Sequence, residues 1–434
     1  MGIWTLVNWP TPLLLVAPGL LWIVRRKIPP SLVSPVWAFV LLLTAVGLVG
    51  YAIYGSTSEN MYGVFQIDGH LAKQTVLIIA ASTTATACGA CVPTLWRETV
   101  EEARPTSLRF SGRRADLAAV ALACLPLLVA LLTWGTLYSR VNYLGQAEGS
   151  LFGLTSMVTV AGLVALGYLL RSSRPALRYL IVIVILLEMT ILFALGTRLF
   201  AMAPVAVALG AYVNNPDRYA PLYLLGSAVL AVLLLPIPLY LRELDQHGLD
   251  PYLSAMSSMP YGWDALHDAI GNLVLGFVVT GATAFNVSQI GLDKILIELS
   301  PVPGRFSGWY EITGELRFTD IFPYSGIGEL WNSSIAFALL TFFAIGIVIG
   351  YIDRKIRELM LEGRRIVAIV LFGLVFLSAL LLPSYNVRNS TRPLWYAIAI
   401  VLIIQVPIDR IPVLDSANRK LRARLGGSAS DTES

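Results

Sequence analysis

A single arginine, Arg198, interrupts an otherwise apolar part of the chain. From Tyr179 to Val213 there are 35 residues, and only Glu188 and Arg198 are charged. This length is too great for one membrane-spanning helix and barely enough for two, so we expect two short helices that meet near Gly196. Arg198 then lies below the membrane surface, at the bottom of a funnel that opens to the outside.

The guanidinium of Arg198 offers five N–H donors in a planar fork, which binds phosphate or carboxylate groups in pairs. A charge at this depth costs about 3 kcal/mol on insertion scales and is usually retained for a partner. We therefore expect Arg198 to bind an anionic group. The alternatives are that its side chain reaches the outer interface, or that it pairs with Glu188 inside the bundle.

Two more arginines, Arg388 and Arg392, lie four residues apart in one short connection between apolar runs. Two cations on one turn attract an anion, which makes this turn a second candidate for substrate binding. The alternative is that Arg392 anchors the chain at the membrane interface together with Trp395 and Tyr396.

The longest connection between apolar runs, Glu243 to Ser333, differs in composition from the rest of the chain. It has eleven acidic residues, three basic residues, twelve aromatic residues and two histidines, His247 and His267. Aromatic rings and carboxylates suit sugars, because C–H faces pack on rings and hydroxyls donate to carboxylates. The alternative is an ordinary exported loop with an interfacial aromatic belt.

Within this connection, Gly271 to Ile290 is apolar enough to resemble another span. A crossing here puts the basic cluster from Arg354 to Arg365 outside the membrane, against the usual excess of positive charge on the inner side. We therefore expect a helix that lies on, or re-enters, the outer leaflet and that walls a site for a lipid-linked substrate.

The elements that must position these residues are apolar helices. Of the 434 residues, 56% are hydrophobic and only 13% are charged. Soluble domains carry about 25% charged residues, so this composition indicates an integral membrane protein. The net charge of +4 gives no indication of nucleic-acid binding.

The predicted fold class is all-α, with about eleven transmembrane helices in one polytopic membrane domain. Each apolar run is long enough, at about 18 to 25 residues, to cross the hydrocarbon core, except one shorter run at 199–213. The other ten runs are 3–24, 31–54, 75–96, 116–138, 150–170, 179–197, 220–241, 335–352, 366–384 and 394–411.

The distribution of basic residues predicts the orientation. With the N-terminus outside and the C-terminus inside, 22 of the 31 Lys and Arg residues fall on the inner side.

The predicted domain is 1–412, which includes the outer loop 243–333 with its amphipathic or re-entrant helix. The remainder, 413–434, is expected to be a partly disordered cytoplasmic tail.

Familiar catalytic motifs are absent from the sequence. There is no GxxxxGK[ST] loop, GxGxxG turn, HExxH helix or DxD pair, so nothing indicates ATP-driven transport, zinc proteolysis or a metal-held sugar nucleotide. The three cysteines, Cys88, Cys91 and Cys124, have no neighbouring His to complete a metal site. We expect neither a metal nor a cofactor.

Several short motifs resemble the Wzy-type oligosaccharide repeat-unit polymerases (O-antigen polymerases). Ile327-Gly-Glu-Leu-Trp-Asn332 leads into an apolar span that ends in Gly350-Tyr351 and a basic turn, Asp353-Arg-Lys355, as is common in that family. Gly196-Thr197-Arg198 is similar to the family's Gly-Ser/Thr-Arg between two short spans. The Pro-rich stretch Leu299 to Arg305 and the number of spans also match.

The resemblance implies a metal-independent membrane glycosyltransferase of exopolysaccharide or cell-envelope biosynthesis. Such an enzyme transfers a growing glycan from polyprenyl (undecaprenyl) pyrophosphate to a lipid-linked repeat unit at the outer face of the membrane. The implied location is the bacterial inner membrane. The implied partners are the polyprenyl-pyrophosphate-linked oligosaccharide, the lipid bilayer, a flippase and a chain-length regulator.

The resemblance also implies roles for individual residues. Arg198 is the first choice for the pyrophosphate, with Arg317 as a second catalytic cation, because arginines there stabilise the charge that develops on the leaving group.

Glu329 matches the family's Gly-Glu and is the expected general base. The alternative for Glu329 is a charge favoured by a helix N-terminus. Substitutes for the base are Glu315, Asp320 and His267. Expected substrate-binding residues are Arg305, Arg388, Arg392, His267, Trp331 and Asn332.

Two other functions remain open at this point. A lipid-linked glycan ligase has the same layout and differs only in its acceptor. A transporter or flippase of lipid-linked oligosaccharide instead uses Glu188 and Arg198 as a coupled pair inside the membrane.

Overall fold

The computed structural model describes residues 11–25, 34–56, 58–61, 65–95, 113–141, 149–172, 175–214, 219–319, 322–362 and 364–405. Within these ranges the chain is almost entirely helical, which confirms the predicted all-α class. The strands that the structure describes there, β1 (Glu59–Met61) and β2 (Phe65–Ile67), form one short antiparallel hairpin. The predicted cytoplasmic tail, 413–434, lies outside the described residues.

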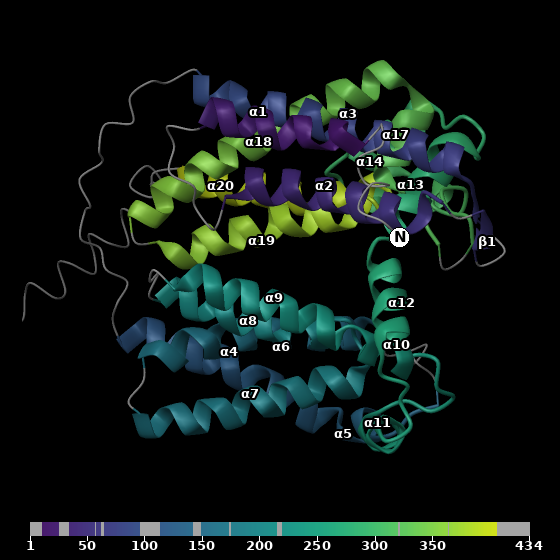
Figure 1. Ribbon diagram of the computed structural model, residues 1–434. Coiled ribbons are helices and arrows are strands. Elements are labelled where there is room, and N and C mark those ends of the chain that lie inside the picture. The colour runs from purple at the N-terminus through teal and green to yellow at the C-terminus, as the bar shows by residue number, and fades with distance from the viewer. Residues whose placement is uncertain are drawn as a thin grey trace, which may run out of the picture.

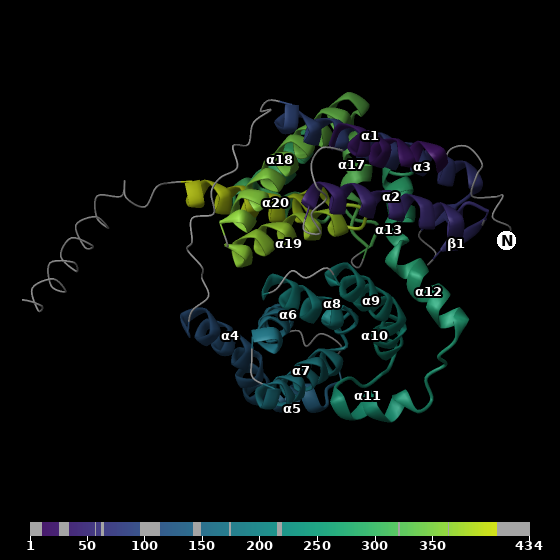
Figure 2. The same ribbon diagram turned by 60° about the vertical axis from the view of Figure 1, so that its left-hand side comes forward.

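The helices form two bundles that lie side by side (Figures 1 and 2). The terminal bundle, built from both ends of the chain, contains η2 (Thr11–Leu15), α1 (Val16–Arg25), α2 (Pro35–Tyr54), α3 (Gly69–Leu95), α13 (Leu275–Phe285), α14 (Leu292–Leu299), α15 (Gly304–Ser307), α16 (Trp309–Ile312), α17 (Gly326–Ser333), α18 (Ile335–Leu361), α19 (Arg365–Leu381) and α20 (Val387–Gln405). The central bundle contains α4 (Arg113–Leu132), α5 (Trp134–Tyr138), α6 (Gly149–Ser172), α7 (Pro175–Leu195), α8 (Leu199–Asn214), α9 (Ala220–Leu234), α10 (Pro236–Leu241) and α11 (Leu249–Met256). Helix α12 (Trp263–Leu273) connects the two bundles.

Five helices among the described residues are long and apolar enough to cross a membrane. They are Pro35–Tyr54, Gly69–Pro93, Leu177–Leu195, Leu222–Leu241 and Ile335–Leu361. A sixth crossing is possible if α12 and α13, which meet at a 40° bend, are counted as one span. These lengths and compositions fit a multi-pass membrane protein. The count of eleven crossings and the outward N-terminus stay predictions.

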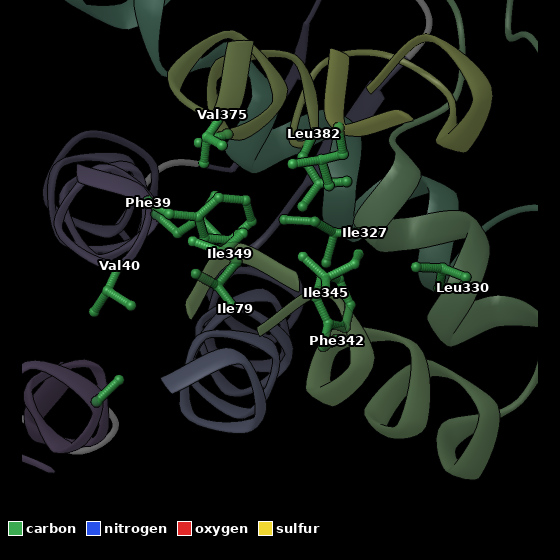
Figure 3. Packing of buried hydrophobic residues seen from close by; sticks show 14 of the residues in the cluster. Phe39, Val40, Ile79, Ile327, Leu330, Phe342, Ile345, Ile349, Val375 and Leu382 are labelled. Carbon is green, nitrogen blue, oxygen red and sulfur yellow. The ribbon is translucent and has the colours of Figure 1, made fainter. Parts of the chain in front are cut away.

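The terminal bundle has one continuous apolar core. Phe39 of α2, Ile79 of α3, Phe342 and Ile349 of α18 and Leu382 after α19 are all buried in it (Figure 3). The central bundle instead has several smaller buried clusters. Because each bundle buries its own apolar side chains, the chain divides into two packed units within the predicted single domain.

Glycine lets the helices of each bundle approach closely. A Cβ atom on Gly346 of α18 would lie 2.1 Å from the Thr86 carbonyl oxygen of α3. One on Gly210 of α8 would lie 1.9 Å from the Val164 carbonyl oxygen of α6. Membrane helices gain little from hydrophobic attraction to one another, so close backbone packing at small residues supplies much of their association energy.

Most of the connection 243–333 lies at one end of the two bundles, at the right in Figure 1, which we call the loop end. Its apolar segment forms α13, whose residues from Gly276 to Thr283 are all buried inside the terminal bundle. The helix predicted within Gly271 to Ile290 is therefore present and does not lie on the surface. The predicted re-entrant alternative, which the 40° bend between α12 and α13 fits, stays a prediction.

The opposite end of the terminal bundle is held by an ion-pair cluster around Asp353 of α18. Its carboxylate accepts hydrogen bonds from Arg25 of α1 at 2.9 Å and from Arg357 at 2.8 Å. The Ser34 hydroxyl donates to its other oxygen. Asp353 and Arg25 are both buried, so this cluster connects the first helices to α18.

Candidate functional site

The two helices α7 and α8 separate at Gly196, as the sequence predicted. Gly196 has a φ of +66°, and a Cβ atom there would lie 2.6 Å from the hydroxyl oxygen of Tyr252. Both facts require glycine at this position, because other residues rarely adopt this φ and have no room. Arg198 follows two residues later, with an exposed side chain. The break therefore presents an arginine at the loop end of the central bundle.

Two further arginines stabilise this break. Arg140, which follows α5, donates to the carbonyl oxygens of Ala194 at 3.0 Å and Leu195 at 3.2 Å. Arg242, which follows α10, donates from Nε to the Gly196 carbonyl oxygen at 3.2 Å. The last carbonyl groups of a helix lack partners within the helix, and cations stabilise this end of its dipole.

Sequence reasoning missed both of these arginines. Arg140 and Arg242 belong to the nine basic residues that the orientation rule places on the outer side, and that unusual location was the available signal. Their positions in the chain, before α6 and after α10, gave no indication that they meet at Gly196. Three arginines from three segments thus converge at one break.

A histidine and a tyrosine lie beside the same break. His247 pairs through its backbone with Arg140, with both N–H to O=C distances at 2.8 Å. Its Nδ1 atom lies 3.0 Å from the hydroxyl of Tyr252, which is fully buried. Burial and the charge of Arg140 lower the pKa of His247. The imidazole is therefore neutral near neutral pH, and the same two causes disfavour its protonation.

The surroundings of the Gly196 break favour an anion. Arg198 is exposed there, and the N-terminus of α8, with its positive dipole, begins at Leu199. The Thr197 hydroxyl oxygen is buried without a hydrogen-bond partner among the described residues. A phosphate group at this break meets a guanidinium and a helix N-terminus at the same time.

Glu188 and Arg198 do not form the ion pair considered from the sequence. Glu188 is fully buried, and neither of its carboxylate oxygens has a hydrogen-bond partner within the described part of the chain. Both oxygens lie against Gly162 of α6, where a Cβ atom would come within 2.7 and 2.8 Å of them. Glu188 therefore lies in the core of the central bundle, separate from the arginines at the break.

Glu329, the expected general base, is also fully buried. Its Oε2 atom accepts a hydrogen bond from the Val387 N–H at 2.7 Å, at the start of α20. Burial and the nearby Glu298 carboxylate raise the pKa of Glu329 well above its usual range. A general base must reach the hydroxyl of a substrate, and here protein atoms surround this carboxylate. The Glu329 carboxylate is thus not accessible to a substrate in this structure.

Arg388, an expected substrate-binding residue, has no exposed surface. Its guanidinium donates to the carbonyl oxygens of Ile297 at 2.9 Å and Val302 at 2.5 Å. It also lies 5.4 Å from the centre of the Trp309 ring. All of these contacts are within the protein, so Arg388 binds the C-terminal end of α14 instead of an outside anion.

The other predicted loop cations have different environments. Arg305 is exposed on α15. Arg317 is half-buried, and its guanidinium donates to the carbonyl oxygen of Thr313 at 3.1 Å and to its hydroxyl. Arg392 is half-buried on α20, close enough to Arg388 for the two charges to repel each other. Within the described part of the chain, none of the three contacts the Gly196 break.

Of the remaining predicted residues, some form hydrogen bonds within the protein and others lie on the surface. The Trp331 indole N–H donates to the Ser82 hydroxyl at 2.8 Å. Asn332 holds the turn after α13, since its Oδ1 accepts from Ile290 N–H at 2.7 Å and its amide donates to Val287 at 3.2 Å.

His267 is exposed on α12, 3.8 Å from Asp268. Of the substitute bases, Glu315 is exposed and pairs with Lys294, and Asp320 lies outside the described residues. No cluster of three or more His, Cys, Asp or Glu side chains that could hold a metal ion occurs among the residues that the structure describes.

The predicted site residues therefore fall into two groups. Arg198 belongs to the central bundle, whereas Glu329, Arg388, Trp331 and Asn332 belong to the terminal bundle. No family model matches this sequence, and the comparisons with curated proteins and with solved structures find no match.

Proposed function

We propose that the chain is a membrane glycosyltransferase that polymerises oligosaccharide repeat units carried on polyprenyl pyrophosphate. The observation that carries this proposal is the convergence of Arg198, Arg140 and Arg242 at the Gly196 break. The resemblance of Gly196-Thr197-Arg198 to the polymerase motif supports the same assignment. The substrate is then an anionic lipid-linked glycan.

In the proposed reaction, a hydroxyl oxygen of the acceptor sugar attacks the anomeric carbon of the donor glycan. The bond from that carbon to the pyrophosphate oxygen breaks, and the electron pair leaves with the polyprenyl pyrophosphate. Arg198 stabilises the charge that develops on this leaving group, while Arg140 and Arg242 fix the break that carries it. A donor of this kind contributes about 3 kcal/mol, or roughly 100-fold in rate.

The proton of the acceptor hydroxyl also needs a destination. Glu329 is buried in the other bundle, whereas the neutral His247 lies beside the break and contacts the Tyr252 hydroxyl at 3.0 Å. Tyr252 in turn lies against Gly196. His247 and Tyr252 are buried as Glu329 is, so none of the three reaches the acceptor hydroxyl, and in the proposal its proton passes to solvent water at the exposed Arg198.

The test is synthesis of polymer by the purified protein in vesicles that contain a polyprenyl-pyrophosphate-linked repeat unit. The wild type should produce a ladder of glycans on a gel, and Arg198→Ala should reduce its rate at least 100-fold. Arg178→Ala, which removes an exposed arginine near the other end of α7, is the matched control and should retain the ladder. A full ladder from Arg198→Ala contradicts the proposed site.

The same assay separates the two alternative functions. A ligase yields a single transfer product on another acceptor and no ladder. A flippase moves the labelled lipid across the bilayer without releasing polyprenyl pyrophosphate. Either result would replace the polymerase assignment.

A further inference from the structure

Helix α7 carries a carboxyl group deep inside the central bundle. Glu188 lies within the apolar span Leu177–Leu195, about 16 Å from one end of the span and about 10 Å from the other at the rise of an α-helix. Its side chain has no exposed surface. Ionisable residues at this depth are rare in membrane helices and usually serve a function, and the reaction proposed at the Gly196 break does not use this one.

The surroundings of the Glu188 carboxyl group are apolar. Its two oxygens lie against Gly162 of α6, and the ring of Pro126 of α4 lies against the same point. A Cβ atom on Gly162 would lie 2.7 and 2.8 Å from the two oxygens and 2.9 Å from the Pro126 ring. The buried clusters on the two sides of this level consist of alanine, leucine and isoleucine. The helices that enclose the carboxyl group thus contribute little polarity to it.

This carboxyl group also lacks a partner. Neither of its oxygens has a hydrogen-bond donor among the described residues. The titratable side chains that the structure describes on α4, α6, α7 and α8 are Cys124, Tyr168, Arg178, Tyr179 and Tyr212. None of these five lies near enough to exert a charge effect on Glu188. A carboxylate without a donor or a counter-charge is unstable in apolar surroundings, so the neutral, protonated form fits this position.

Buried hydroxyl groups lie between Glu188 and the loop end. Thr155 and Thr159 precede Gly162 by seven and three residues on α6, so the three share one face of that helix. Both threonines are buried, and the Thr159 hydroxyl donates to the Thr155 carbonyl oxygen at 2.7 Å. The consecutive helices α6 and α7 run antiparallel, so the start of α6 lies at the loop end, beside the end of α7 (Figure 1). The face of α6 that meets Glu188 therefore carries hydroxyl groups toward that end.

We propose that Glu188 is a proton-binding site inside the membrane, and that it exchanges its proton with the loop end along the Thr159–Thr155 face of α6. On release, the O–H bond of Glu188 breaks and the proton passes to the Thr159 hydroxyl oxygen. That hydroxyl turns and gives its original hydrogen to the next oxygen toward Thr155 and the surface water. A metal ion needs several oxygen ligands, and the described residues around Glu188 add no further acidic group to its two oxygens.

The first experiment is infrared spectroscopy of the full chain in phosphatidylcholine vesicles near neutral pH. A neutral carboxyl group has a C=O stretch apart from the amide bands, and this band shifts when deuterium replaces the proton. Wild type minus Glu188→Gln should show one such band, which separates this group from Glu298 and Glu329. Glu311→Gln makes the same change at an exposed position of α16 and is the matched control, which should keep the band. If Glu188→Gln does not fold, Glu188→Leu serves the same comparison.

The second experiment measures the route by transfer of the vesicles to heavy water. Thr159→Val removes the hydroxyl at nearly constant shape, and it should slow the deuterium shift of the Glu188 band severalfold without removing the band. Thr190→Val is the matched control, because Thr190 is an exposed threonine of α7 whose hydroxyl donates to the Leu186 carbonyl oxygen at 2.9 Å. It should leave the exchange rate unchanged.

Three results overturn the proposal. The first is a Glu188→Gln spectrum that has lost no carboxyl band. The second is an exchange rate that Thr159→Val leaves unchanged. The third is loss of the band when sodium chloride replaces choline chloride, which makes Glu188 a cation site. Each readout is independent of glycan synthesis, so the proton site and the proposed polymerase activity are tested separately.

Discussion

Glu298 and Glu329 direct their carboxylates to the first turn of the same helix, α20. Glu329 accepts the Val387 N–H at 2.7 Å, and Glu298 accepts the Arg388 N–H at 3.2 Å. Both carboxylates are fully buried and close enough to interact. Two like charges in one buried site repel each other, so the pair retains at least one proton near neutral pH.

This pair predicts that the loop end loses stability as the pH rises. Burial raises the pKa of Glu298 from 4.5 to about 7, and burial and the Glu298 charge raise that of Glu329 too, so the folded state binds more protons than the unfolded state. The stabilisation is complete below pH 4.5 and is lost as the pH rises through 7, by roughly 3 kcal/mol for Glu298. Amide hydrogen exchange in α14, corrected for intrinsic rates, should show protection falling from pH 5 to pH 8. Glu329→Gln should reduce this pH dependence, and an unchanged profile would contradict the shared titration.

Arg388 should be essential for the fold of the loop, not for binding an anion. Arg388→Ala leaves the carbonyl groups of Ile297 and Val302 without their donor and should destabilise this region by about 2–4 kcal/mol. Limited proteolysis between α14 and α17 reports the change. Arg392→Ala, one turn further along α20, is the control and should have little effect. Arg388→Ala with normal protease resistance would be inconsistent with this role.

Gly162 and Glu188 should be energetically coupled. Gly162→Ala places a methyl group within 2.7 Å of a Glu188 carboxylate oxygen and 2.9 Å of the Pro126 ring. We expect it to cost about 1–3 kcal/mol of stability in the wild type. In a Glu188→Ala background the same change should cost less, with a coupling energy of about 1 kcal/mol or more. Denaturant unfolding in micelles measures this double-mutant cycle, and strictly additive effects would disprove the contact.

Gly196 should be required for activity at the break. Gly196→Ala forces a side chain into a φ of +66° and against the Tyr252 hydroxyl, at a cost of about 1–3 kcal/mol. The expected result is loss of the glycan ladder from a protein that remains helical by circular dichroism. Tyr252→Phe removes the nearest atom and should partly restore the stability of Gly196→Ala. Full polymer synthesis by Gly196→Ala would argue against a precise geometry at Arg198.

The sequence predicted several elements correctly because their signals are local. The residue count between Tyr179 and Val213 required two helices, and they separate at Gly196 as expected. The apolar segment from Gly271 to Ile290 forms α13. Which of its two expected placements it takes, on the membrane surface or inserted among helices, was not predictable, because its hydropathy is the same in both.

The candidate site was predictable only in part. Arg198 was identified because it is one of only two charged residues in an apolar stretch. This signal comes from composition alone. Arg388 and Glu329 were expected to contact a substrate, whereas Glu329 is buried against α14 and α20, and Arg388 of α20 is buried against the end of α14. Their motifs do not reveal this packing, and their substrate roles stay predictions. A polar residue type does not tell whether the side chain binds a ligand or holds neighbouring segments of the protein together.

An apolar helical chain and the boundary between α7 and α8 were predictable from the amino-acid sequence, because hydropathy, glycine positions and segment length act over a few residues. The meeting of Arg140 and Arg242 at Gly196, and of Glu298 and Glu329 at one helix terminus, is seen only in the folded chain. These contacts join segments far apart in the chain. Their geometry depends on how whole helices pack, which no local pattern of residues encodes.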